Sequence, residues 1–206
     1  MGTEAKSAVP AFTEALGDTD VEVRKQAVMA LANIGPDAKP AAEALANVLN
    51  DPDKEVRKNA VKALAKIADG SKPVVSGLAQ ALKDEDKDLR MEVADALAAI
   101  GPPAKAAVPN LIACLEDLGP KDKLKRDRIG TGLGKIGKDK DSIALLINAL
   151  ASPNPSVRSG SCIALGEVGP PAKKAAVSLA ALASNDGIIE VRDAARTAYS
   201  KVTAKP

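Results

Sequence analysis

The stretch from Asp51 to Ile67 reads DPDKEVRKNAVKALAKI, and it decides the fold. Asp53 is a preferred helix-capping residue, so a helix is expected to start directly after it. Apolar residues then recur at the spacing that places them on one face of an amphipathic helix. These residues are Val56, Ala60, Leu64 and Ile67. The stretch therefore predicts a helix with one buried face.

Similar sequence motifs recur around six arginines, which are 33, 33, 36, 32 and 34 residues apart. The arginines are Arg24, Arg57, Arg90, Arg126, Arg158 and Arg192. A fixed period of this size indicates a stack of repeated units, in which each unit buries its apolar face against its neighbours. Stacked arrays present long surfaces to other macromolecules, so the period favours a binding function.

Each repeat is also expected to contain an earlier helix. In the second repeat this first helix is predicted over 41–49, and Asn50-Asp51-Pro52-Asp53 ends it. Glycine followed by proline closes several repeats, at 35–36, 101–102 and 169–170. Glycine suits a left-handed helix end, and proline stops the helix from continuing. No segment alternates with period two, so each repeat is expected to be a helical hairpin without strands.

The composition limits the function. The chain has 206 residues, of which 46% are hydrophobic, with one Phe, one Tyr and no Trp. Its 29 basic and 27 acidic residues give a net charge of +2. Nucleic-acid binders usually carry a larger basic excess and use aromatic side chains for base stacking, so nucleic acid is not an expected partner. No apolar run is long enough to span a bilayer, so no membrane insertion is expected.

The first residues lack the apolar core of a signal peptide, which predicts a cytoplasmic protein. The chain starts almost at a repeat boundary, because Gly2 aligns with Gly35. The chain could therefore also be a piece of a longer array of repeats.

The side chains that catalysis needs are scarce. The chain has no His, which removes the usual general base and most zinc sites. Cys114 and Cys162 fall on apolar helix positions in different repeats and are expected to be buried free thiols. The glycines of Gly132-Leu133-Gly134-Lys135-Ile136-Gly137 lie inside an expected helix, whereas a dinucleotide fingerprint follows a strand. No catalysis, cofactor, metal or small-molecule substrate is therefore expected.

The whole pattern resembles the HEAT repeat, and most closely the short bacterial type found in phycobilin lyase subunits. The resemblance rests on 51–67 and on two similar first helices, AKSAVPAF at 5–12 and AKAAVPNL at 104–111. It implies an all-α, right-handed α-solenoid (superhelix) of six HEAT-like helical hairpins, with the second helices on the concave face. We expect a single domain over 1–206, with repeats at about 3–35, 36–69, 70–102, 103–137, 138–170 and 171–204.

The resemblance also implies a structural ladder between repeats, formed by the turn aspartate and the arginine of the second helix. By position, the role falls on Asp18, Arg24, Asp51, Arg57, Asp84 and Arg90. The C-terminal half departs from this pattern. Ser152 replaces the aspartate of the fifth repeat, three extra residues separate Asp117 from Arg126, and an insertion lies close to Asp186.

Helix phase predicts which face of each second helix is free to bind a partner. The core positions are −1, +3, +7 and +10 relative to the repeat arginine, and the opposite face is +1, +2, +5 and +9. The side chains on that face differ in charge and size from repeat to repeat. This variation is typical of an interaction surface, and equally of a surface that is free to change without consequence. The candidate partner-binding residues are Gln26, Met29, Asn59, Lys62, Lys66, Glu92, Asp95, Arg128, Thr131, Lys135 and Ile163.

The fourth repeat has an extended loop and a glycine-rich second helix. The loop is a candidate basic site through Lys121, Lys123 and Lys125, which would bind an acidic partner or phosphate groups. The alternative is that the loop is a solvated insertion without a binding role. Gly130, Gly132 and Gly134 stand where other repeats mostly have Ala, and each costs about 1 kcal/mol of helix propensity. They predict either a weak helix that acts as a hinge in the array, or a helix whose backbone can be approached closely at the glycines.

The function expected from these observations is a non-catalytic scaffold or adaptor that binds another protein or peptide on the concave second-helix face. Two alternatives remain open. One is a phycobilin lyase-type subunit or a chaperone for a bilin or its acceptor protein. The other is a HEAT-like DNA-binding protein.

Overall fold

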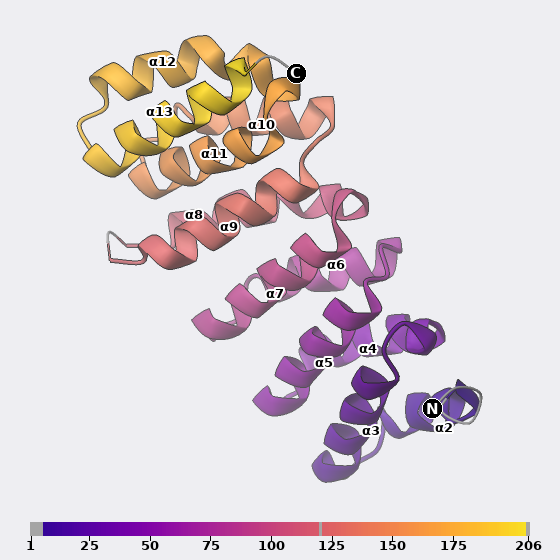
Figure 1. Cartoon of the computed structure of the whole chain (residues 1–206). Coiled ribbons are helices and arrows are strands. Elements are labelled where there is room, and N and C mark those ends of the chain that lie inside the picture. The colour runs from indigo at the N-terminus through magenta and orange to yellow at the C-terminus, as the bar shows by residue number, and fades with distance from the viewer. Residues whose placement is uncertain (1–5, 120, 205–206) are drawn as a thin grey trace. The chain divides into compact units, whose positions relative to one another are not determined.

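The computed structural model describes residues 6–119 and 121–204 (Figure 1). The chain divides into two compact units, Met1–Ile100 and Gly101–Pro206, which are called unit 1 and unit 2 below. The predicted start of the first repeat at residue 3 and residue 120 of the predicted loop lie outside the described residues. The prediction of a single domain stays a prediction.

Unit 1 contains the first three repeats. Its second helices are α3 (Val21–Ile34), α5 (Lys54–Ile67) and α7 (Lys87–Ile100). Its first helices are α2 (Val9–Ala15), α4 (Ala42–Asn47) and α6 (Lys72–Ala81), with 3-10 turns η1 (Gly35–Ala41) and η2 (Val48–Asn50) on either side of α4. Helix α5 packs between α3 and α7, and α4 packs against α6, so the second helices form one layer and the first helices another.

Unit 2 repeats this arrangement. Its second helices are α9 (Lys123–Ile136), α11 (Pro155–Val168) and α13 (Ile189–Thr203). Its first helices are α8 (Val108–Glu116), α10 (Lys140–Ala149) and α12 (Ala176–Asn185), and the 3-10 turns η3 (Pro102–Ala107) and η4 (Pro170–Ala175) precede α8 and α12. Helix α11 packs between α9 and α13, and α8 packs against α10.

The predicted all-α solenoid repeat fold is confirmed. Every regular element among residues 6–119 and 121–204 is a helix. Most apolar side chains at the predicted core positions are buried, although Val23 at position −1 and Tyr199 at position +7 are 38% and 42% exposed. The position seven residues after the repeat arginine is buried in the first five repeats. There the structure buries Leu31, Leu64, Leu97, Leu133 and Leu165. None of the helices in the described part of the chain is long and apolar enough to cross a membrane.

Helices α5 and α11 begin directly after their capping residues. The Asp53 carboxylate accepts hydrogen bonds from the backbone N–H groups of Glu55 at 2.9 Å and Val56 at 3.0 Å. These bonds stabilise the ionised form and lower the pKa of Asp53. Asn154 caps α11 in the same way, with Pro155 as the first helical residue. Local sequence therefore fixes the start of these helices.

The first helices differ from the prediction. The predicted helix over 41–49 is instead three short pieces, which together occupy 35–50. Pro40 lies inside η1 and has no N–H to continue an α-helical ladder, so the chain takes the tighter 3-10 form before α4 begins. The same Gly-Pro start precedes η3 and η4, which makes this broken first helix a recurrent feature of the fold.

The predicted Gly-Pro pairs end three of the second helices, although their glycines adopt a backbone region other than the predicted one. Gly35, Gly101 and Gly169 have φ values of 70°, 74° and 73° with ψ near −140°, which is outside the left-handed helical region. Side chains are rarely tolerated at such angles. Repeat two has no glycine at its end, and Ala68 takes the left-handed conformation there with φ 49° and ψ 38°.

We expect Ala68→Gly to stabilise the protein by about 0.5–1 kcal/mol, because glycine removes the steric cost of a left-handed alanine. The matched control is Gly169→Ala, which introduces a side chain at positive φ and should destabilise. Urea unfolding of both variants measures the two effects. An Ala68→Gly variant no more stable than the wild type would show that the turn after α5 relaxes freely.

Gly130 and Gly134 of α9 favour the predicted alternative of a close backbone approach, and the hinge stays a prediction. A Cβ added at Gly134 would lie 2.6 Å from the carbonyl oxygen of Ala164, and one added at Gly130 would lie 2.8 Å from that of Gly160. Both carbonyls belong to α11. The glycines therefore allow two helix backbones to approach closely, and their weak helix propensity is offset by the packing that they permit.

Candidate functional site

An arginine–aspartate ladder joins successive repeats of unit 1. Nε and Nη2 of Arg24 donate to the Asp51 carboxylate at 2.7 and 3.0 Å. Nη1 of Arg24 donates to the carbonyl oxygen of Asp18 at 2.9 Å. The hydrogen bond to Asp51 raises the pKa of Arg24. Each arginine thus holds the backbone of its own turn and the carboxylate of the next repeat.

The next rung has the same geometry. Nε of Arg57 donates to Oδ2 of Asp84 at 2.8 Å, and its Nη1 donates to the carbonyl oxygen of Asp51 at 2.9 Å. Arg90 in turn donates to the carbonyl oxygen of Asp84 at 2.8 Å. The side chains of Arg57 and Asp84 are largely buried. In unit 1 the charges of Arg24, Asp51, Arg57 and Asp84 are therefore engaged within the fold. Asp18 is exposed, and its carboxylate accepts a hydrogen bond from the backbone N–H of Asp20 at 2.8 Å.

Unit 2 contains one complete rung. Nε and Nη2 of Arg158 donate to the Asp186 carboxylate at 2.7 and 3.0 Å, so the insertion near Asp186 does not break the pair. The hydrogen bond from Arg158 holds the pKa of Asp186 below its ordinary value. At the preceding junction Ser152 replaces the aspartate, and Arg126 is buried without a hydrogen-bond partner for its Nε.

The second-helix face of unit 1 carries a cavity of about 350 Å³, called the unit 1 groove below. It lies between α3 and α5. Its walls are formed by Met29, Ala32, Asn33, Asn59, Lys62, Ala65 and Lys66. Four of these residues were predicted as partner-binding from helix phase: Met29, Asn59, Lys62 and Lys66. The Met29 side chain is 46% exposed, so the groove offers an apolar surface beside two lysines.

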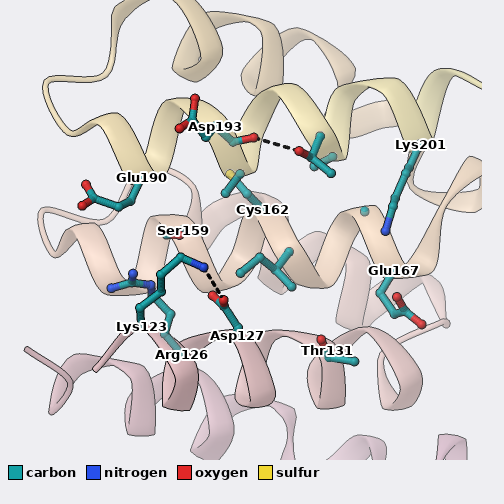
Figure 2. Close-up of a pocket in the computed structure, with 15 residues that line it drawn as sticks. Lys123, Arg126, Asp127, Thr131, Ser159, Cys162, Glu167, Glu190, Asp193 and Lys201 are labelled. Atoms are coloured by element: carbon teal, nitrogen blue, oxygen red, sulfur yellow. Dashed lines mark hydrogen bonds and ion pairs between the residues drawn. The ribbon is translucent and has the colours of Figure 1, made fainter. Parts of the chain in front are cut away.

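A second cavity, of about 430 Å³, lies along α9, α11 and α13 and is called the helix groove (Figure 2). Charged side chains of both signs line it. They are Lys123, Arg126, Asp127, Glu167, Glu190, Asp193 and Lys201. Figure 2 shows the ion pair between Lys123 and Asp127, in which Nζ and Oδ2 are 2.7 Å apart. Of the predicted residues, Thr131, Ile163 and Lys123 reach this groove.

The remaining predicted partner-binding residues lie on the second helices but outside these two grooves. They are Gln26, Glu92, Asp95, Arg128 and Lys135. Glu92 faces Lys58 across the helix pair, with Oε1 and Nζ 3.7 Å apart. Two of the three lysines assigned to the basic loop, Lys123 and Lys125, lie in the first turn of α9, and Lys121 alone lies in the loop. The loop is therefore less basic than predicted.

The residues that sequence reasoning missed lie at the turn end of the helix groove. A third cavity, of about 570 Å³, adjoins it there and is called the turn cavity. It is bounded by the turn at 153–156 and by Leu118, Ile188 and Val191. Arg126, Ser159 and Glu190 line both cavities. The signal for this site in the sequence was the serine at position 152, which leaves one ladder arginine without its aspartate.

Both cysteines are buried thiols. Cys162 lies beneath the helix groove, and burial raises the pKa of its thiol to about 12. A thiol with such a pKa is a poor nucleophile at neutral pH. Among residues 6–119 and 121–204, no group of three or more His, Cys, Asp or Glu side chains is arranged to hold a metal ion.

Comparison with solved structures identifies the same architecture elsewhere. An engineered protein is 24% identical with a TM-score of 0.58, and the match covers 94% of this chain and 96% of that one. A designed armadillo repeat protein in complex with the peptide (KR)4 is 19% identical with a TM-score of 0.60, covering 94% and 99%. The archaeal HEAT-like repeats protein from Thermococcus onnurineus NA1 is 16% identical with a TM-score of 0.57, covering 97% and 91%. At these identities the likeness shows the fold.

A comparison with curated proteins finds no match. Family models are more informative. The model described as HEAT repeats matches residues 42–120 and 108–200, and the model described as HEAT repeat matches residues 8–38. The finer resemblance to phycobilin lyase subunits stays a prediction. Because these matches span most of the sequence and agree with the helical hairpins and the ladder, the chain belongs to the HEAT-repeat family.

Proposed function

We propose that the chain is a non-catalytic scaffold that binds a peptide or protein segment on its second-helix face. The observation that carries this proposal is the position of the two grooves. The unit 1 groove and the helix groove both open on second helices, at positions that helix phase left free of the core. Rigid helices on either side hold each groove in shape, which lowers the entropy cost of binding.

The chemistry of the grooves suits a polypeptide ligand. Each combines apolar surface with a few charged groups, as interaction sites commonly do. In unit 1, Met29 provides the apolar contact, and Lys62 and Lys66 provide positive charge. In unit 2, Ile163 lies between charged residues of both signs. The designed armadillo repeat protein named above, whose fold is similar, forms a complex with the peptide (KR)4, and this supports peptide binding as a use of such a fold.

The proposal is tested by selecting displayed random peptides on the immobilised full-length protein and measuring their affinities for variants. Lys62→Glu with Lys66→Glu reverses charge in the unit 1 groove. Thr197→Arg places a large side chain into the helix groove, because Thr197 is an exposed residue that lines it. We expect at least one of these changes to weaken a selected peptide by about tenfold or more, since contacts inside a groove carry most of the binding energy.

Matched controls separate groove binding from general effects. Lys173→Glu with Lys174→Glu reverses two exposed charges in η4, and Ser200→Arg adds the same bulk to α13 outside the groove. Both controls should leave the affinity within about twofold, as surface changes away from a contact usually do. Peptides that are sensitive to Lys173→Glu with Lys174→Glu and not to the groove variants would show that the binding face lies on the side of the first helices.

A further inference from the structure

Three junctions between repeats share one device, in which an arginine meets the aspartate of the following repeat. The pairs are Arg24–Asp51, Arg57–Asp84 and Arg158–Asp186, with N–O distances of 2.7, 2.8 and 2.7 Å. Each carboxylate also accepts a hydrogen bond from the backbone N–H two residues later, as Asp51 does from Asp53 at 2.8 Å. The carboxylate of each ladder aspartate therefore makes two kinds of contact. The first closes its own turn, and the second neutralises a largely buried arginine of the preceding repeat.

Ser152 makes only the first of these contacts, the one that closes the turn. Its hydroxyl oxygen accepts a hydrogen bond from the backbone N–H of Asn154 at 3.2 Å, which closes the turn before α11. A serine side chain is shorter than an aspartate and carries no charge, so it cannot supply the second contact. The junction between the fourth and fifth repeats thus keeps the turn of the ladder and lacks its carboxylate.

Arg126 is left without the aspartate partner that Arg24, Arg57 and Arg158 have. The residue is 5% exposed, and its Nε is buried without a hydrogen-bond partner. Its side chain forms no hydrogen bond or ion pair with any residue in 6–119 or 121–204. A buried guanidinium N–H that lacks an acceptor is costly, because the donor has lost its hydrogen bond to water without gaining another. The site is therefore built to accept an anionic group.

The cavities around Arg126 show what kind of group fits. The turn cavity is bounded by Pro153, Asn154 and Pro155, so it lies at the turn from which a ladder aspartate would extend. Leu118, Ile188 and Val191 make its other walls apolar. Figure 2 shows Arg126 at the end of the helix groove where Ser159 and Glu190 lie. A ligand in the helix groove can therefore reach Arg126 and place an apolar group beside it.

We propose that Arg126 binds the carboxylate of an Asp or Glu side chain of the bound peptide, and that a bulky apolar residue next to it fills the turn cavity. The partner's carboxylate takes the place that an aspartate of the next repeat holds at Arg24, Arg57 and Arg158. A guanidinium binds a carboxylate through paired, charge-assisted hydrogen bonds, which gives orientation as well as affinity. The Ser159 hydroxyl lines both cavities and can donate to the same carboxylate. This inference rests on the proposed peptide-binding function and specifies its ligand in unit 2.

Glu190 is the acidic side chain that lines both cavities together with Arg126. It is exposed and forms no ion pair within the described residues. Its negative charge opposes the arrival of a second carboxylate. Glu190→Gln should therefore tighten carboxylate binding several-fold while leaving the stability of the protein almost unchanged. If Glu190 were instead the natural partner of Arg126, this substitution would destabilise the protein without improving binding, and the proposal would fail.

The first experiment uses acetate, the simplest carboxylate, and the NMR signal of the Arg126 Nε–Hε group in the full chain. We expect acetate to shift this signal in the wild type in a saturable way, and chloride at the same ionic strength to have no such effect. Ser152→Asp restores the ladder carboxylate and should abolish the response to acetate. Ser152→Asn has the size of Asp without the charge, and it should weaken the response less. An Arg126 signal that ignores acetate in the wild type overturns the carboxylate site.

The second experiment uses peptides selected on the full chain that are sensitive to Thr197→Arg. We expect them to share an Asp or Glu next to a bulky apolar residue, and to lose about tenfold or more in affinity when that acid is replaced by its amide. Ser152→Asp should cause a similar loss. Peptides without a shared acid, or with an affinity unchanged by Ser152→Asp, contradict the inference while peptide binding itself stands. If no peptide binds either groove, the proposed function fails, and a response of Arg126 to acetate then shows a carboxylate site without a peptide.

Discussion

Arg57→Ala is expected to lower the free energy of unfolding by about 1–3 kcal/mol, through the loss of charge-assisted hydrogen bonds that join two repeats. The substitution removes the 2.8 Å contact with Asp84 and the 2.9 Å contact with the carbonyl oxygen of Asp51. It also leaves the largely buried carboxylate of Asp84 without its counter-charge. Urea unfolding followed by circular dichroism measures the effect.

Lys58→Ala is the matched control, because Lys58 is the next residue on the same helix. Its Nζ lies 3.7 Å from Glu92 and its side chain is 33% exposed, so it belongs to a weak surface pair. We expect a change within about 0.5 kcal/mol for this variant. Equal losses for the two variants would mean that the ladder contributes no more than an ordinary surface contact.

Gly134→Ala is expected to destabilise the protein by about 1–3 kcal/mol, although alanine is the better helix former, because overpacking against a neighbouring helix outweighs propensity. The added Cβ would overlap with the Cβ of Glu167 and lie 2.6 Å from the carbonyl oxygen of Ala164. A side-chain tip could move aside, but a backbone carbonyl within α11 cannot do so without shifting the helix.

Gly17→Ala serves as the control, since the nearest atom to its added Cβ is 3.7 Å away. That change should stay within about 0.5 kcal/mol, as is usual for exposed positions. A more stable Gly134→Ala variant would show that α9 and α11 can separate at little cost, and it would restore the interpretation of α9 as a weak helix.

Most of the fold could be predicted because its determinants are local and repeated. The capping residues Asp53 and Asn154, the apolar stripe of each second helix and the closing Gly-Pro pairs each act within a few residues. The broken first helix was missed because the pattern of 41–49 contains the apolar spacing of a helix, while the tight turn before it follows from the placement of Pro40. Apolar spacing does not distinguish α from 3-10 geometry in such short segments.

The glycines of α9 show the limit of propensity arguments. A glycine within a helix lowers its intrinsic stability, and the sequence shows only that cost. The compensating contact is with α11, about 30 residues away, and depends on how close two backbones come. Such an approach is a property of tertiary packing, so sequence reasoning could name close contact as an alternative but could not choose it.

The sequence could predict which side of the second helices carries the candidate site, but it could not predict the role of Arg126. Helix phase placed Met29, Lys62, Thr131 and Ile163 on the open side of the second helices, and the grooves lie there. The role of Arg126 depends on which aspartate each arginine contacts. The structure shows that the contact goes to the following repeat, so the serine at position 152 affects the arginine of the repeat before it.

The most direct test of partner binding by the second-helix face is to map a bound peptide on the protein by amide chemical shifts. A peptide selected on the full chain is titrated into labelled protein, and the shifted amides are assigned to helices. We expect the largest shifts in α3 and α5 around the unit 1 groove, or in α9, α11 and α13 around the helix groove. Shifts concentrated in the first helices α2, α4, α6, α8, α10 and α12, with the second helices unaffected, would contradict this expectation.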